Sequence, residues 1–168
     1  RSTLFPYTTL FRSIPLILKG IATAEDARIA LDHGVDWIYV SNHGGRQLDH
    51  GRGSMHVLPE IVQAVAGRAK IMVDGSICRG TDIVKAIVSG ADLVGIGRLQ
   101  CWALAAAGEA GIVRMLELLE DEVMRCLGLL GATSFAELDK SYLHPATPTN
   151  LPSVFSAFPL LDIDPYRY

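Results

Sequence analysis

Short apolar runs alternate with segments of helical spacing along most of this 168-residue chain. The apolar runs read as buried strands and cover residues 14–18, 37–40, 71–73 and 93–96. The segments between and after them have apolar residues at helical spacing and cover residues 23–33, 55–65, 81–89 and 103–127. Strands that alternate with helices predict an α/β fold whose parallel sheet is connected by right-handed crossovers.

Each predicted strand is followed by a polar or glycine-containing segment, marked by Lys19, Ser41, Asp74 and Gly97. Functional sites lie at the carboxyl ends of the strands both in (β/α)₈ barrels and in open doubly wound sheets. A complete barrel needs about 250 residues, and four strand–helix units supply half of one. The pattern therefore leaves two architectures open, a small open sheet and a piece of a barrel.

The segment after the second predicted strand, SNHGGRQLD at residues 41–49, contains the clearest chemical signal. Histidine, here His43, is the residue type that exchanges a proton near neutral pH. Arg46 offers a guanidinium that can hold a carboxylate through two parallel hydrogen bonds. The intervening Gly44 and Gly45 allow the backbone to turn sharply. A base three residues from an anion-binding group predicts chemistry on a small acid.

Composition narrows the class of protein. Apolar residues make up 49% of the chain and charged residues 20%, a balance typical of a globular domain. The net charge of −3 and the pI near 5.9 argue against a nucleic-acid partner. No apolar stretch reaches the roughly 18 residues of a membrane span. The three cysteines lack metal-ligand spacing and favour a reducing compartment, so we expect a cytoplasmic location.

Three regions are expected along the chain. Residues 1–13 show neither helix nor strand periodicity and resemble translated sequencing-adapter sequence, so we expect them to be non-native. Residues 14–143 form the predicted α/β domain, with a short last helix near residues 134–138. Residues 144–168 contain five prolines and are expected to form an irregular tail. The apolar stripe of the long helix is predicted to pack in the core; its members are Ile112, Met115, Leu116, Leu119, Val123 and Met124.

The 41–49 segment, with residues 15–20 before it and residues 73–75 and 95–98 after it, resembles the FMN-dependent α-hydroxy-acid oxidase and dehydrogenase family. Glycolate oxidase, lactate oxidase, mandelate dehydrogenase and flavocytochrome b2 are familiar members of this family. The resemblance runs from about Ile14 to Gly131. Family members are TIM (β/α)₈ barrels, so the resemblance implies that this chain is the C-terminal half of one. It would supply strands five to eight and their helices.

The resemblance also implies roles for individual residues. His43 would be the catalytic base and would also contact the substrate, whose carboxylate Arg46 would bind. Lys19 would lie beside the flavin N1 and C2 carbonyl, and Ser41 would hydrogen-bond the flavin. Asp74 would meet the ribityl hydroxyls of FMN. The residues expected around the FMN phosphate are Gly75, Ser76, Gly97 and Arg98.

The phosphate segment departs from the family pattern. Ser76 replaces a glycine, and Cys78 stands where an arginine normally contacts the FMN phosphate. Two alternatives follow from the loss of this charge. Arg79 reaches the phosphate instead, or FMN is bound more weakly.

The implied activity of the full-length enzyme is the oxidation of a small 2-hydroxy acid to a 2-oxo acid with FMN as cofactor. Oxygen, a quinone or a cytochrome remain open as the electron acceptor, and the full-length enzyme is expected to be a homo-oligomer. The aspartate that orients the catalytic histidine belongs to the half of the barrel that is absent, so the chain alone is expected to be inactive. The alternatives are a truncated, non-catalytic half-barrel and another FMN barrel enzyme, which the pairing of His43 with Arg46 disfavours.

Overall fold

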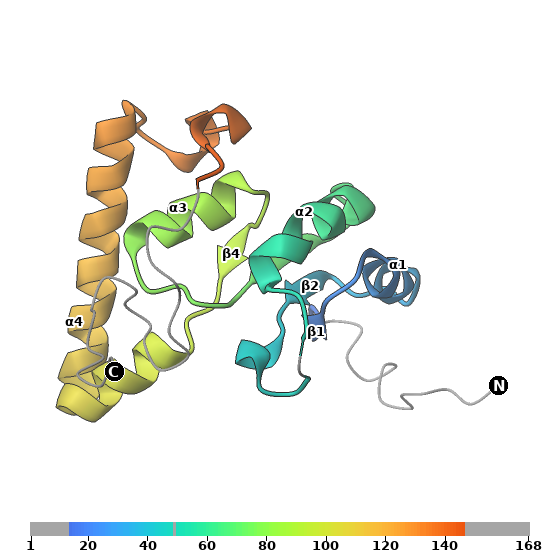
Figure 1. The fold of residues 1–168 in the computed structure, drawn as a ribbon, viewed down its shortest axis with the longest axis horizontal. Coiled ribbons are helices and arrows are strands. Elements are labelled where there is room, and N and C mark those ends of the chain that lie inside the picture. Colours follow the sequence, from blue (N-terminus) through green and yellow to red (C-terminus); the bar gives the residue numbers. More distant parts are fainter. Residues whose placement is uncertain (1–13, 49, 147–168) are drawn as a thin grey trace, which may run out of the picture.

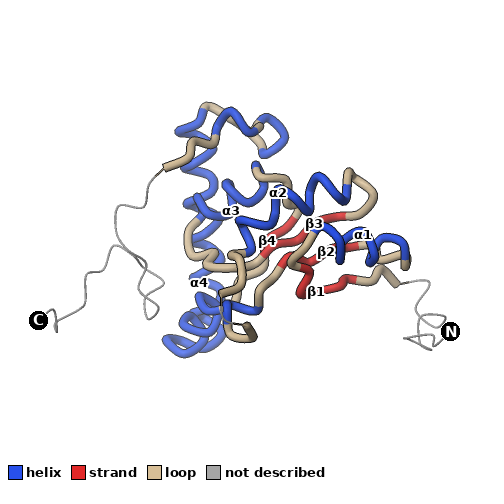
Figure 2. The backbone as a smooth tube through the Cα atoms, turned by 45° about the vertical axis from the view of Figure 1, so that its right-hand side comes forward, coloured by secondary structure: helices blue, strands red, loops and turns tan. Residues whose placement is uncertain are grey.

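Four parallel strands form a single sheet in which spatial order follows chain order (Figure 1 and Figure 2). The computed structural model describes residues 14–48 and 50–146. The strands are β1 (Ile17–Ile21), β2 (Trp37–Val40), β3 (Lys70–Val73) and β4 (Leu93–Val94). Each strand pairs in parallel with its neighbour in sequence. The predicted parallel sheet is therefore confirmed, with β4 shorter than its predicted span.

Three helices cover one face of this sheet (Figure 2). They are α1 (Ala24–Asp32), α2 (Ser54–Val65) and α3 (Gly80–Val88), close to the spans predicted from sequence. Thr23 caps α1, because its Oγ1 accepts a hydrogen bond from the Asp26 N–H at 3.1 Å. The described part of the chain therefore consists of strand–helix units laid side by side.

Side chains along β2 and β3 point alternately to the two faces of the sheet, and those on one face are more deeply buried than those on the other. Ile38 and Val40 of β2 and Ile71 and Val73 of β3 are buried in the main core with the apolar residues of α2. Burying one such side chain stabilises the fold by about 1.5–3 kcal/mol. Their neighbours, including the half-buried Tyr39, point to the opposite face. The strand residues that do not pack against the helices therefore point to the other face of the sheet, which would be the interior of a barrel.

Strand β1 extends beyond its predicted end because Gly20 forms a bulge. Lys19 pairs with Tyr39 and Ile21 pairs with Val40, so Gly20 has no partner in the register. Its φ of +101° is one that residues with a side chain rarely adopt. The expected strand end at Leu18 was therefore wrong, since the glycine continues the strand instead of terminating it.

Helix α4 (Arg98–Leu130) begins earlier than predicted and is interrupted at Ala107 and Gly108. Gly108 has φ +57° and ψ −137°, a glycine conformation, and a short first segment turns into a long second one (Figure 1). The predicted short helix after Gly131 is a 3₁₀ turn, η2 (Phe135–Glu137), and a second turn, η3 (Lys140–Tyr142), follows. None of the described helices is long and apolar enough to cross a membrane.

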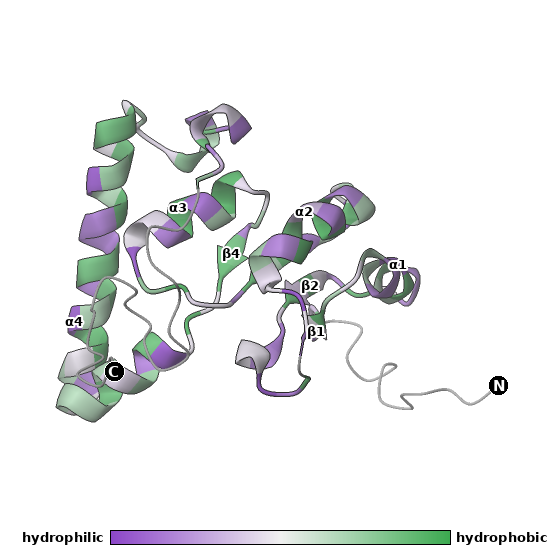
Figure 3. Cartoon of the chain, viewed as in Figure 1, coloured by the Kyte–Doolittle hydropathy of each residue, from purple (hydrophilic) through white to green (hydrophobic). Residues whose placement is uncertain are grey.

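The apolar stripe of α4 is only partly in the core. Met115 and Leu119 are buried, whereas Leu116 and Met124 are 53% and 62% exposed, so the core prediction was wrong for these two. The reason is that α4 packs against α3 along one side and leaves other apolar residues uncovered (Figure 3). The predictions for residues 1–13 and for the tail beyond residue 146 lie outside the described residues.

The contact between α3 and α4 depends on a glycine. A Cβ at Gly80 would lie 2.5 Å from Glu122 Cβ and 2.6 Å from the Val123 nitrogen. We expect Gly80→Ala to destabilise the chain by about 1–3 kcal/mol, because α3 and α4 must move apart to make room for the added methyl group. Urea unfolding followed by circular dichroism measures this change.

The matched control is Gly128→Ala on α4, where a Cβ would meet no atom within 4 Å. Alanine has the higher helix propensity, so this variant should be more stable by about 0.5–1 kcal/mol. Equal unfolding midpoints for the two variants would contradict this account of the α3–α4 contact.

Candidate functional site

Lys19, in the middle of β1, meets Ser41 and Asp74, which directly follow β2 and β3. Lys19 Nζ donates a hydrogen bond to Ser41 Oγ at 2.9 Å and pairs with the Asp74 carboxylate. Ser41 is 2% exposed, and its Oγ also accepts the His43 N–H at 3.2 Å. Residues that are up to 55 positions apart in sequence thus form one polar cluster at the carboxyl edge of the sheet. The sequence predicted each member, and the fold unites them.

His43 lies beside this cluster at the start of the short turn η1 (His43–Gly45). A Cβ on Gly20 would come within 3.0 Å of the His43 Cε1 and 3.3 Å of its Nε2, so the imidazole packs directly on the β1 bulge. The His43 backbone has a positive φ of 56°, which is uncommon outside glycine. Within the described residues no carboxylate hydrogen-bonds the imidazole. Gly20 was not predicted as a site residue, although a glycine inside an apolar strand indicates a bulge or a close approach.

Arg46 follows η1 and is exposed. It forms no ion pair with any residue of the described ranges, which leaves its guanidinium available for an anion. The loop that bears it is held by Arg52, which binds Glu60 of α2 through two hydrogen bonds of 2.7 and 2.8 Å. Asn42 also donates to the Arg52 carbonyl at 3.3 Å. No feature of the sequence distinguished Arg52 from an ordinary surface arginine.

The expected phosphate residues lie at the ends of β3 and β4. Gly75 and Ser76 have φ angles of +117° and +55°, so the backbone turns sharply after Asp74. Gly97 precedes the first residue of α4, Arg98, which is exposed. The N-terminus of a helix presents free N–H groups and a partial positive charge, both of which favour an anion.

Arg79 is engaged elsewhere. Its Nε and Nη2 both lie 2.8 Å from Glu122 Oε1, and the other carboxylate oxygen of Glu122 accepts the Gly80 N–H at 2.7 Å. A contact between Arg79 and a phosphate would therefore require this ion pair to break. Glu122 lies 43 positions away on α4, so sequence inspection gave no sign of the pairing.

Cys78 is a poor candidate for a reactive thiol. Burial, and then the charge of Asp82, raise the pKa of the thiol, although Arg98 acts in the opposite direction. A thiol with a raised pKa remains protonated and weakly nucleophilic.

One further property of the cluster fits a polyol-phosphate cofactor such as FMN. Asp74 Oδ1 is buried and lacks a hydrogen-bond partner among the described residues. A buried acceptor without a donor is rare in native proteins, and the hydroxyl of a bound ligand can satisfy it. A ligand that extends from Lys19 past Asp74 to the start of α4 would contact three groups in this order: the Lys19 ammonium, the Asp74 carboxylate as a hydrogen-bond acceptor, and the N–H groups at the N-terminus of α4 as a site for an anion.

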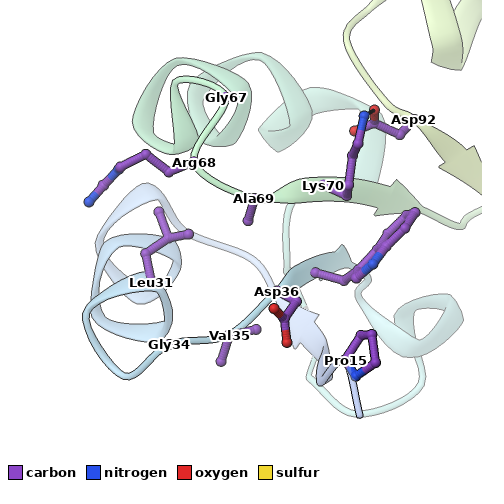
Figure 4. Close-up of a pocket in the computed structure, with 11 residues that line it drawn as sticks. Pro15, Leu31, Gly34, Val35, Asp36, Gly67, Arg68, Ala69, Lys70 and Asp92 are labelled. Atoms are coloured by element: carbon purple, nitrogen blue, oxygen red, sulfur yellow. Dashed lines mark hydrogen bonds and ion pairs between the residues drawn. The ribbon is translucent and has the colours of Figure 1, made fainter. Parts of the chain in front are cut away.

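A concavity at the other end of the strands is structural (Figure 4). Its charged side chains have protein partners: Lys70 Nζ lies 2.7 Å from Asp92, and Asp36 accepts the Leu16 N–H at 2.8 Å. These contacts fix the amino-terminal ends of the strands. In barrels that end serves stability, whereas chemistry takes place at the carboxyl end.

Comparison with known proteins agrees with the fold. The sequence profile of the FMN-dependent dehydrogenases matches residues 11–145. The L-lactate oxidase of Nostoc sp. is 47% identical over 131 residues, which are 78% of this chain and 36% of that protein. Glycolate oxidase 3 of Arabidopsis thaliana is 44% identical over 145 residues, which are 86% of this chain and 39% of that protein.

Among solved structures, a mandelate oxidase is 48% identical, with a TM-score of 0.73 over 76% of this chain and 37% of that one. The fold is therefore part of a TIM barrel of the kind seen in flavin-dependent oxidases. The chain belongs to the FMN-dependent dehydrogenase family. It spans well under half the length of the relatives that it matches.

The electrostatics of the cluster predict an alkaline dependence of stability. Burial, and then the negative charge of Asp74, raise the pKa of Tyr39 from 10.0 to about 12. The folded chain thus holds this proton more tightly than the unfolded chain, so the associated stabilisation is complete below pH 10 and is lost as the pH rises towards 12.

Urea midpoints measured from about pH 8 to about pH 12 should fall less steeply in Tyr39→Phe than in the unchanged chain. Tyr142→Phe, which removes an exposed tyrosine, should keep the original slope. Identical slopes in all three proteins would show that Tyr39 is not the group responsible.

Proposed function

We propose that this chain provides one wall of the active site of an FMN-dependent enzyme that oxidises a small 2-hydroxy acid to a 2-oxo acid. The observation that carries the proposal is the gathering of Lys19, Ser41 and His43 at one edge of the sheet. Arg46, which has no ion-pair partner among the described residues, lies in the adjoining loop. The relatives' names support it, since they include L-lactate oxidase, glycolate oxidase and the 2-hydroxyacid oxidase 1 of Mus musculus.

Two residues would act on the substrate. Arg46 would bind the substrate carboxylate through a bidentate contact, which fixes the orientation of the 2-hydroxy carbon. The His43 imidazole would accept the proton released as this carbon is oxidised, since histidine suits proton acceptance near neutral pH. The contact with Gly20 would hold the ring close to Lys19.

Bound FMN would supply the chemistry of accepting two electrons from the substrate. Lys19 would lie where the reduced ring gains negative charge, with Ser41 donating to the same ring. Asp74 would accept a hydrogen bond from a ribityl hydroxyl through its Oδ1, which has no partner among the described residues. The turn at Gly75 and Ser76 and the start of α4 at Gly97 and Arg98 would hold the phosphate.

The chain by itself is proposed to be inactive. Ile17 and Leu93 of the two outermost described strands are 50% and 47% exposed, so the sheet still presents apolar surface at both edges. The same observation favours the second candidate, a non-catalytic half-barrel. The proposed inactivity of the chain alone is tested by mixing the purified chain with FMN and a 2-hydroxy acid, where we expect neither stoichiometric binding nor turnover. Stoichiometric yellow flavin together with turnover would show that the chain needs no other part of the barrel.

The proposed roles can be tested in a spliced barrel in which residues 14–146 replace the matching part of the Nostoc L-lactate oxidase. His43→Asn should lower kcat by about 10²–10⁴-fold and leave FMN bound, because it removes the base alone. Arg46→Lys should raise KM, because a lysine cannot make the bidentate contact. Dye reduction with a series of 2-hydroxy acids measures both effects.

Arg125→Lys, a surface change on α4, serves as the control and should leave the kinetics unchanged. A spliced barrel that binds FMN but oxidises no 2-hydroxy acid would support the non-catalytic alternative. Wild-type turnover in His43→Asn would exclude His43 as the base.

The two arginines considered for the FMN phosphate can be tested separately. Arg98→Ala in the spliced barrel should weaken FMN binding about ten- to a hundredfold, as expected for a lost charged hydrogen bond. Arg79→Ala should instead lower the urea midpoint, since Arg79 is paired with Glu122. Quenching of flavin fluorescence measures the affinity.

Riboflavin, which lacks the phosphate, is the matched ligand control, and its affinity should be the same with and without Arg98. Equal losses of FMN affinity in both arginine variants would contradict the assignment of the phosphate to Arg98 alone.

A further inference from the structure

Tyr39 occupies a central place on the sheet face that α1, α2 and α3 leave uncovered (Figure 2). It lies on β2 and pairs with Lys19 of β1 on one side and with Met72 of β3 on the other. Its neighbours in sequence, Ile38 and Val40, are fully buried on the opposite face. The ring therefore projects towards the interior of the barrel, in the same layer as the cluster at the strand ends.

The Tyr39 ring makes the third contact of the Lys19 ammonium. Nζ lies 4.0 Å from the ring centroid, within the range of a cation–π interaction. The other two contacts are with Ser41 Oγ and with the Asp74 carboxylate. The Lys19 side chain is still 44% exposed, so its flexible stem needs these contacts to keep one position.

The far end of the Tyr39 ring is fitted to Gly95, the residue that directly follows β4. A Cβ at Gly95 would lie only 1.9 Å from Tyr39 Oη and 3.0 Å from its Cζ, although Gly95 has an ordinary φ. The same point is 3.3 Å from Asp74 Cβ. Gly95 thus leaves the space that the phenol fills, and the phenol extends from the Lys19 ammonium of β1 to the backbone just after β4.

We propose that Tyr39 is a positioning residue, which holds the Lys19 ammonium at the flavin-facing end of β1 and needs the space at Gly95 to do so. This rests on the proposed function for the link between Lys19 and the flavin. The contacts among Lys19, Tyr39 and Gly95 are independent of that link. A residue that merely filled the core would leave Lys19 held equally well by Ser41 and Asp74 alone.

The test follows the motion of the Lys19 side chain in the 168-residue chain. The sequence contains only four lysines, Lys19, Lys70, Lys85 and Lys140, so ¹³C-labelled lysine gives a simple spectrum. Lys70 is the internal reference, because it is ion-paired with Asp92 at 2.7 Å and makes no cation–π contact within the described residues. We expect the ε-methylene of Lys19 to be more ordered than that of Lys70.

Three variants separate the possible causes. Tyr39→Phe keeps the ring and should leave the order of Lys19 unchanged. Tyr39→Leu should lower it to the level of Lys70. Gly95→Ala keeps the ring but displaces it, and should lower the order of Lys19 without affecting Lys85. Urea unfolding confirms that each variant is folded.

An unchanged Lys19 order parameter in folded Tyr39→Leu would overturn the proposal, and so would a loss of order in Tyr39→Phe. The reduction potential of FMN in the spliced barrel tests the underlying function separately. It should fall in Tyr39→Leu and not in Tyr39→Phe. A change in Lys19 order with no change in potential would count against the role of Lys19 at the flavin and leave its positioning by Tyr39 intact.

Discussion

Packing of the helices on one face of the parallel sheet is the constraint on which the rest of the structure depends. It buries Ile38, Val40, Ile71 and Val73, and alternation then turns Tyr39 and Asp74 to the other face. A slip of one residue in the register would exchange the two sets. The polar cluster at the strand ends is therefore a consequence of how the apolar residues pack, and it needs no long-range polar contact to specify it.

Several features of the fold and site could be predicted because they are local. The apolar runs, the cap at Thr23 and the polar strand ends are visible within a few residues of one another. The parallel arrangement of the strands then implies that Lys19, Ser41 and Asp74 meet at one edge. The residues of the 41–49 segment are specific enough to indicate the family, which composition and periodicity alone do not indicate.

The features that sequence inspection missed depend on contacts between distant segments. The pairing of Arg79 with Glu122 joins α3 to α4, and the fit of Tyr39 to Gly95 joins β2 to β4. The exposure of Leu116 and Met124 depends on which side of α4 meets α3, a choice that helical spacing leaves open. The break in α4 lies in the backbone conformation of Ala107 and Gly108. The presence of a glycine in a long helix does not by itself predict such a break, since α4 continues through Gly111 and Gly128.

The neighbour-to-neighbour order of the strands has a consequence for how the chain folds. The longest separation between paired strand residues is that of Trp37 and Lys70, 33 positions apart. Each doubling of such a loop raises the entropic cost of closing it by only about 0.6 kcal/mol, so no step of sheet assembly is much harder than another. The sheet can then grow by one strand at a time, as in a repeat protein. On that route the ammonium of Lys19 would find Ser41 and Tyr39 before Asp74, and the helix start at Arg98 would be added last.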